Sequence, residues 1–420
     1  MKFCQLQINF PRLKSKLDIL SSIGKTPEGG VRRLALTTED KQGRDKVVGW
    51  MRDLELEVSI DQIGNIFAIW SSQHDIPPVM TGSHIDTVYN GGNLDGNLGV
   101  LAGLEVIETL KENGIQTRRP IVVAVFTNEE GARFHPDMMG SLVCCGGLSL
   151  GTALSTTDRQ GNTVSDELQR IGYAGTRVCG EINPHSFVEL HIEQGPILER
   201  EGITIGAVEN LQGISWTEVV IAGQSNHAGT TPMHLRFDAG YCAAAITTFV
   251  HDLAIEMGNG QVATVGVIEL QPNIINVVPS TARLTVDLRN GDNELLSAAE
   301  GRLEDFLEQL SKDNGVDIKT KSLARFDPVN FDQKIVEIIE VTAEKLNYNY
   351  RRMTSGAGHD AQMMSRICPS AMIFTPSING VSHNPAEATN EPDLVAGSNV
   401  LLHTILALAE DSTVQFPQAR

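Results

Sequence analysis

Apolar residues follow two different spacings along the first third of the chain. Longer stretches of mixed apolar and polar residues predict helices at 11–23, 37–54 and 99–112. Shorter runs rich in apolar residues predict strands at 65–70, 78–82 and 121–125. Strands and helices that take turns in this way are typical of an α/β fold with a mainly parallel sheet. In such sheets ligands bind at the carboxyl ends of the strands.

The pattern changes near residue 213. The next predicted elements are a strand, a helix, two strands, a helix and a strand, at 214–223, 237–257, 263–271, 280–290, 293–312 and 316–322. This order predicts a compact α+β sandwich, so we expect 213–328 to be a lid domain inserted into the α/β domain. The α/β pattern resumes at residue 331, with helices expected at 332–346, 359–366 and 393–409. The catalytic domain is therefore predicted to comprise 1–212 and 329–420.

Length and charge narrow the possible classes of protein. The chain has 420 residues, with a net charge of −19 and 41% hydrophobic residues, which suggests two or three globular domains. Nucleic acid and anionic membranes need clustered Lys and Arg, so neither is an expected partner. The polar N-terminus lacks a secretory apolar segment, and no apolar run reaches the length of a transmembrane helix. The six cysteines lack the spacing of metal ligands. These features favour the cytoplasm.

Metal-type side chains stand at or beyond the ends of apolar runs spread over three hundred positions. They are His84, Asp95, Glu130, His191 and His383. A two-metal hydrolase needs imidazole and carboxylate ligands of this kind, with one carboxylate bridging ions roughly 3.5–4 Å apart. We therefore predict a two-metal site, with zinc as the expected ion and manganese, cobalt or nickel as suitable alternatives.

The neighbours of these residues suggest further roles. Asp86 lies two positions after His84 and is expected to orient its imidazole. Asp95 lies between glycines, which suits the bridging position, although such an Asp also stabilises turns. Glu129, beside Glu130, is the expected general base, whereas a solvated loop is the alternative for this pair. Gln194 follows His191 closely and can hydrogen-bond a polar substrate.

Several longer motifs carry a family resemblance. They are GSHIDTVYNGGNLDG, FTNEEGARF, ELHIEQGPILE, GQSNHAGTTPM, INVVPS, DLRN and SGAGHDAQ. Together they resemble the hydantoinase/carbamoylase branch of the di-zinc metallopeptidase superfamily over nearly the whole chain. This branch includes N-carbamoyl-L-amino-acid hydrolases, allantoate amidohydrolases and β-ureidopropionases. HIEQG is the most specific motif, because peptidases of the superfamily usually carry Asp or Glu where this chain has His191.

The resemblance implies a zinc-peptidase α/β domain and a ferredoxin-like lid that forms a homodimer. It implies that one ion is bound by His84, Asp95 and His191, and the other by Asp95, Glu130 and His383. Residues with implied roles toward the substrate are His227, which polarises the scissile carbonyl, then Asn276, Arg289, Gly356, Ala357 and Gly358. From the residues alone, a structural ion pair with Asp287 is an equal alternative for Arg289.

The expected activity is metal-dependent hydrolysis of the ureido group of an N-carbamoyl-L-amino acid to an amino acid, ammonia and carbon dioxide. Allantoate is the alternative substrate. A dipeptidase or aminoacylase of the same superfamily is a further alternative, against which His191 argues. A non-catalytic dimeric binding protein is the last alternative, against which the complete set of ligands and Glu129 argues.

Overall fold

The computed structural model describes residues 6–72 and 74–410. The chain forms two compact units: Asn210–Asn330 is one, and the remaining described residues form the other. The predicted insert, 213–328, lies within the first of these units. We refer to Asn210–Asn330 as the lid unit and to the rest as the catalytic unit.

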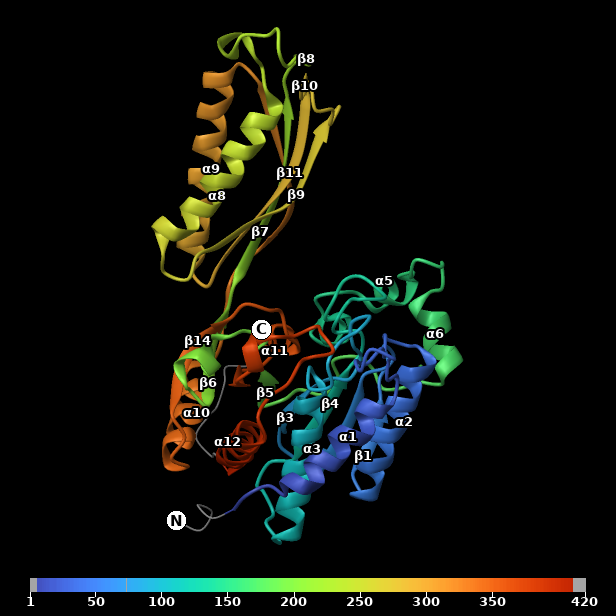
Figure 1. The fold of residues 1–420 in the computed structure, drawn as a ribbon. Coiled ribbons are helices and arrows are strands. Elements are labelled where there is room, and N and C mark those ends of the chain that lie inside the picture. Colours follow the sequence, from blue (N-terminus) through green and yellow to red (C-terminus); the bar gives the residue numbers. More distant parts are fainter. Residues whose placement is uncertain (1–5, 73, 411–420) are drawn as a thin grey trace. The chain divides into compact units, whose positions relative to one another are not determined.

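The catalytic unit is built on a mixed sheet of nine strands, of which the short last one, Val329–Asn330, falls within the lid unit (Figure 1). In the order β1-β2-β4-β3-β5-β15-β6-β13 they are Glu57–Ile60, Ile66–Trp70, Ile121–Phe126, Val79–His84, Ser186–Ile192, Ser370–Thr375, Ile205–Leu211 and Val329–Asn330, and β14, Tyr350–Ser355, pairs with β6. The four central strands are parallel to one another, in the pairs β4–β3, β3–β5 and β5–β15. The pairs β1–β2, β2–β4, β15–β6 and β6–β13 are antiparallel, so the prediction of a mainly parallel sheet holds only for its centre.

Helices cover this sheet. The longer ones are α1 (Phe10–Ser22), α2 (Thr38–Asp53), α3 (Asn97–Glu112), α10 (Gln333–Lys345) and α12 (Glu391–Glu410), and the shorter ones are α4 (Met139–Cys144), α5 (Leu150–Ser155), α6 (Val164–Ile171), α7 (Ile197–Glu201) and α11 (Asp360–Met364). Thr37 caps the N-terminus of α2, because its hydroxyl accepts a hydrogen bond from the backbone amide of Asp40. Helix α12 is long and apolar enough to cross a membrane, but it is mostly buried in this unit and serves as a core helix.

The central strands bring the predicted ligands to one edge. All six residues of β3 and β4 and all seven of β5 are buried, as nearly continuous apolar strands between helices should be. His84 is the last residue of β3, and Glu129 and Glu130 follow β4. His191 is the last residue but one of β5. Because these strands are parallel, their carboxyl ends meet at the same edge of the sheet.

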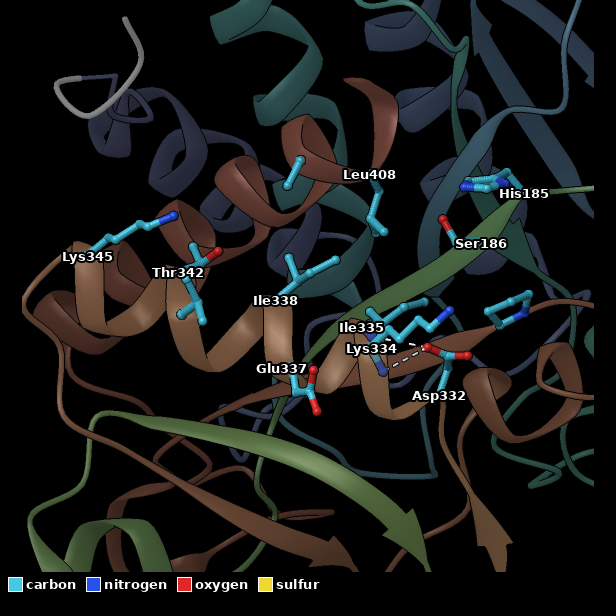
Figure 2. A pocket seen from close by; sticks show the side chains of 13 residues that line it. His185, Ser186, Asp332, Lys334, Ile335, Glu337, Ile338, Thr342, Lys345 and Leu408 are labelled. Atoms are coloured by element: carbon cyan, nitrogen blue, oxygen red, sulfur yellow. Dashed lines mark hydrogen bonds between the residues drawn. The ribbon is translucent and has the colours of Figure 1, made fainter. Parts of the chain in front are cut away.

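A pocket of about 490 Å³ lies elsewhere in the catalytic unit (Figure 2). Its walls come from α10, α12 and the first residue of β5, Ser186. His191 follows Ser186 by five positions on the same strand, which is roughly 17 Å at the rise of a strand. The pocket is therefore at the opposite end of β5 from the metal-type side chains.

The lid unit is a four-stranded antiparallel sheet with two helices on one face (Figure 1). In the order β12-β7-β11-β9 its strands are Asp317–Phe326, Gly213–Ala222, Thr281–Asn290 and Val262–Gln271, and the helices are α8 (Ala239–Met257) and α9 (Asn293–Asn314). Every second residue of β11 is buried, so one face of the strand joins the apolar core. The short strands β8 (Asn226–His227) and β10 (Val277–Val278) form a separate pair.

Candidate metal centre and substrate residues

Asp95 lies between two groups of potential metal ligands. Its Oδ1 is 3.1 Å from His191 Nε2 and 3.4 Å from His84 Nε2. Its Oδ2 is 3.3 Å from His383 Nε2, and the same nitrogen is 3.3 Å from Glu130 Oε2. Three groups of described side chains could each hold an ion: one is Glu189–His191–His359, and the two that share Asp95 are His84–Asp95–His191 and Asp95–Glu130–His383. These are the two ligand sets that the family resemblance implies, and the division of the Asp95 oxygens between them suits a bridging carboxylate.

Backbone carbonyls fix the two buried imidazoles. His84 Nδ1 is 2.9 Å from the carbonyl oxygen of Asp86, and His191 Nδ1 is 2.9 Å from that of Ile192. A carbonyl can only accept, so in the neutral imidazole each Nδ1 carries the proton and each Nε2 presents a lone pair. Both Nε2 atoms face Asp95, which is the arrangement that a metal ion requires.

The carboxylate of Asp86 has a different role from the one predicted. Its nearer oxygen is 3.9 Å from His84 Nδ1, which is too long for a hydrogen bond. Instead Asp86 Oδ1 accepts a hydrogen bond from the backbone amide of Glu129 at 3.2 Å, and Oδ2 accepts one from that of Glu130 at 3.3 Å. Asp86 therefore orients His84 through its main chain and holds the two glutamates in place through its side chain.

Glu129 is buried beside the first ligand group. Its Oε2 is 3.4 Å from His84 Nε2. Burial raises the pKa of Glu129 well above its ordinary value against the opposing effect of His84, and the carboxylates of Asp360, Glu130 and Asp95 raise it further. The pKa of Glu130 is raised to about 8, first by burial and then by Asp95. A carboxylate with a raised pKa is a better proton acceptor, which suits a general base.

The donor set fits a cation. His84 Nε2 is buried and has no hydrogen-bond partner among the described residues. A buried imidazole lone pair and three crowded carboxylates are costly without a positive charge between them. A Cβ added to Gly96 would lie 2.4 Å from His84 Nε2, so the backbone here leaves space that only glycine allows.

A second layer of buried polar residues supports β5 and was not predicted as a layer. Glu189, two residues before His191, accepts the hydroxyl of Ser83 at 2.6 Å and the amide of Ala361 at 2.8 Å. The ring of His359 packs against that of His191, with centroids 4.5 Å apart. Burial lowers the pKa of His359 well below its ordinary value, so it stays neutral beside the ligands. The signal for this layer was a charged residue inside the apolar run of β5.

The remaining predicted residues of the catalytic unit are Gln194, which contacts a predicted metal ligand, and residues 356–358, which form a loop. Gln194 donates its side-chain amide to Asp95 Oδ2 at 2.8 Å. Residues 356–358 form the loop before α11, where the amide of Ala357 donates to Ser355 Oγ at 3.2 Å. A Cβ at Gly358 would meet Met138 at 3.0 Å, so this loop is closely packed.

The lid unit brings two of its three predicted residues together. Ala228, next to His227, donates its amide to the carbonyl of Asn276 at 3.0 Å, and His227 pairs with Val277 across β8 and β10. The amides of Gly229 and Thr230 donate to His227 Nδ1 at 3.1 and 3.3 Å. Because Nδ1 accepts, a neutral His227 carries its proton on Nε2 and can donate it to a carbonyl oxygen.

Arg289 lies near the other end of β11. It forms an ion pair with Asp287, with Nη2 2.9 Å from Oδ2. Thr281, where β11 begins, is eight positions from Arg289, which corresponds to roughly 27 Å. His227 and Asn276 belong to the segments that lead to this start of β11. Within one lid unit, Arg289 is therefore separated from His227 by most of the length of the sheet.

The fold and the ligand geometry define an α/β enzyme with a candidate metal centre at the carboxyl edge of its sheet. The model of peptidase family M20/M25/M40 matches residues 80–407, and the chain belongs to this family. It is 40% identical to an N-carbamoyl-L-amino-acid amidohydrolase of Rhizobium meliloti over 96% of this chain and 97% of that protein. It is 36% identical to the allantoate amidohydrolase of Escherichia coli, with 94% and 97% covered.

A solved structure is similar over almost its full length. An amidase of the hydantoinase/carbamoylase family from Burkholderia multivorans has a TM-score of 0.94 at 42% identity, with 97% of this chain and 99% of that chain covered. The resemblance to this branch of amidases, predicted from the motifs, is confirmed. The α/β fold class is confirmed as well.

Proposed function

We propose that this chain is a metal-dependent amidohydrolase that cleaves the ureido C–N bond of N-carbamoyl-L-amino acids. The observation that carries the proposal is the division of Asp95 between two ligand groups, with Glu129 beside one of them. The names of the relatives support the substrate class, because N-carbamoyl-L-amino-acid amidohydrolase is the name of the Rhizobium meliloti protein. The reaction breaks a C–N bond other than a peptide bond.

The residues divide the chemistry between them. Two divalent ions in the ligand groups would polarise the carbamoyl oxygen and lower the pKa of a water molecule. Glu129 accepts a proton from the attacking water, whose oxygen bonds to the carbamoyl carbon. Glu129 then returns that proton to the leaving nitrogen as the C–N bond breaks. His227, with its proton on Nε2, donates a hydrogen bond to the oxygen that gains negative charge.

The substrate carboxylate needs a cationic partner remote from the reacting carbon. Arg289 supplies a guanidinium fork that matches a carboxylate, and Asp287 holds that fork in orientation through both of its oxygens. Gln194, on Asp95 Oδ2, is placed to hydrogen-bond the ureido group. Asn276 and the backbone of residues 356–358 are proposed as further contacts to the substrate.

We infer a homodimer formed through the lid unit. Arg289 lies near the end of β11, whereas His227 lies on β8 near the start of β11, so the two are too far apart to hold one small substrate within one lid. A partner's lid supplies the missing end. Strand β9 is an edge of the sheet, and it exposes apolar side chains, as does α8: Val262, Val267, Ile268, Tyr241 and Ile255. Such an edge tends to be covered by a partner.

Allantoate is the alternative substrate, because it also carries a ureido group and a carboxylate.

The proposed location is the cytoplasm, and the net charge of −19 makes nucleic acid and anionic membranes unfavourable partners.

An assay of ammonia release on N-carbamoyl-L-amino acids, allantoate and dipeptides tests the proposal, together with metal analysis of the same sample. We expect two ions per chain, turnover of N-carbamoyl-L-amino acids, loss of turnover on chelation and recovery on addition of Zn²⁺, Mn²⁺, Co²⁺ or Ni²⁺. A higher kcat/KM for allantoate than for N-carbamoyl-L-amino acids would make allantoate the substrate. Full turnover in a verified metal-free sample would contradict the mechanism.

A further inference from the structure

Glu387 is a buried carboxylate that has no part in the chemistry described so far. Its side chain belongs to the segment after His383, and only 6% of the residue is exposed. Its Oε1 accepts the backbone amides of Leu94 and Asp95, both at 3.1 Å. Its Oε2 accepts the hydroxyl of Ser382 at 2.9 Å. Each oxygen of Glu387 thus holds the chain next to a different metal-type residue.

Gly92 makes this contact possible. A Cβ added at Gly92 would lie 2.2 Å from Glu387 Oε1 and 2.4 Å from Glu387 Cβ, which no side chain could tolerate. The loop 92–95 therefore lies with its bare backbone against Glu387. Two independent features, the hydrogen bonds and the missing side chain, fit the same close approach.

The two segments joined by Glu387 are distant in the chain. Asp95 lies two residues before α3, whereas Ser382 is 287 positions later. Ser382 also approaches Asp95 directly, with its hydroxyl 3.4 Å from Oδ2. The side chain of His383 is 52% exposed and its backbone has a φ of 53°, and besides Asp95 its imidazole contacts Glu130 at 3.3 Å and Gln194 at 3.5 Å. A residue in the left-handed region needs its surroundings to hold it there.

We propose that Glu387 is a positioning residue that sets the distance between Asp95 and His383 and so makes the ion site Asp95–Glu130–His383. This inference rests on the proposed function, since it assumes that the two ligand groups bind metal. The other group, His84–Asp95–His191, depends less on Glu387, because its imidazoles come from buried strands and are fixed by their own backbone carbonyls. Residues that orient ligands in this way typically change metal affinity 10–100-fold when they are removed.

The test is a titration of the metal-free full-length chain with Co²⁺ against a competing chelator, followed by its visible absorption spectrum. In Glu387→Ala the ion of Asp95–Glu130–His383 should bind 10–100-fold more weakly, and the ion of His84–Asp95–His191 should lose less affinity, because Asp95 is the only ligand that the two groups share. Glu387→Gln keeps an oxygen for the two amides and should give an intermediate loss. Gly92→Ala, whose methyl group displaces Glu387, should lower the affinity for the same ion. Ser382→Ala, which removes the hydrogen bond to Glu387 Oε2, should do so as well. These variants also keep the test open if Glu387→Ala fails to fold.

Glu105→Gln is the matched control. Glu105 is also a buried carboxylate that joins two segments, since it accepts the amide of Asn9 at 2.8 Å and the side chain of Arg12. It contacts neither ligand loop, so its loss should lower the melting temperature and leave both ion affinities unchanged. Two tightly bound ions in Glu387→Ala, or an equal loss of metal in Glu105→Gln, would overturn the inference. Wild-type protein that binds no second ion would instead contradict the proposed function.

Discussion

The backbone of Gly96 lies directly against the imidazole of His84. Gly96 has a φ of 65°, and a Cβ built on it would be 2.4 Å from His84 Nε2, the atom that faces Asp95. The residue after the bridging carboxylate thus has to be small for two reasons: its backbone is left-handed, and the ring of His84 fills the space that a side chain would take.

Gly96→Ala should therefore weaken the ion held by His84, Asp95 and His191, by about 10-fold or more if it behaves as other changes around metal ligands do. Gly114→Ala is a matched control, because Gly114 follows the same helix with a φ of 63° and its Cβ would meet nothing within 4 Å. Gly114→Ala should lose about 1–2 kcal/mol of folding stability from the left-handed backbone alone. Gly96→Ala should lose more, because its φ of 65° and ψ of −46° lie outside the left-handed helical region and its Cβ also meets His84. Equal metal affinity in the two variants would contradict the steric argument.

Glu129→Gln should keep both ions and lose about 10²–10⁴-fold in kcat, since one positioned proton-transfer group contributes that much. The amide has nearly the same shape, and the backbone of Glu129 remains held by Asp86. Metal analysis and steady-state kinetics on the same preparation check this. If the variant instead lost metal and regained normal turnover on remetallation, the roles of Glu129 and Glu130 would be exchanged.

Arg289→Ala should weaken binding of a carboxylate substrate by about 1.5–3 kcal/mol, the usual worth of a hydrogen bond to a charged group. The same change should matter much less for the corresponding substrate amide, and the two KM values report the difference. Arg283→Ala is the matched control, because Arg283 is on the same strand and forms an ion pair with Glu218. If the acid and the amide lost equal binding affinity, Arg289 would have only a structural role, in its ion pair with Asp287.

His227 should act in the partner's site. Inactive His227→Ala and inactive Glu129→Gln subunits, mixed and allowed to exchange, should then regain about a quarter of wild-type activity, because half of the dimers are hybrids with one complete site each. Each variant exchanged with itself is the control. A verified hybrid population without recovered activity would place His227 in its own subunit's site or outside catalysis.

Local patterns in the sequence predicted the long helices and the long strands of the lid unit, but not β1, β6, β14 and β15 or the short helices α4 to α7. The strand at 280–290 is β11 (Thr281–Asn290), and the helix at 293–312 is α9 (Asn293–Asn314). Strand direction was less predictable, because the pairing of β2 with β4 joins residues far apart in the chain. A residue's spacing also does not tell which of its atoms acts. Asp86 was expected to contact His84 through its carboxylate, yet its carbonyl does so.

The five metal-type side chains were predictable because each stands at or beyond the end of an apolar run. Their grouping around Asp95 needed the resemblance, since spacing alone does not show which strand ends are neighbours. The contacts of Glu387 were not predictable at all. Its three hydrogen bonds come from two loops that are far apart in the chain, and only folding brings them together.

The crowding of acids and imidazoles around Asp95 makes metal loading an exchange of ions for protons. In the metal-free chain, burial raises the pKa of Glu130 to about 8, and the hydrogen bond to Asp95 raises that of His383 to about 9. At neutral pH both groups hold protons that a ligand must give up. Loading should therefore acidify an unbuffered solution, and its heat should depend on the ionisation enthalpy of the buffer. Affinity should increase as the pH rises from 7 to 9, so alkaline solution would favour the loaded enzyme.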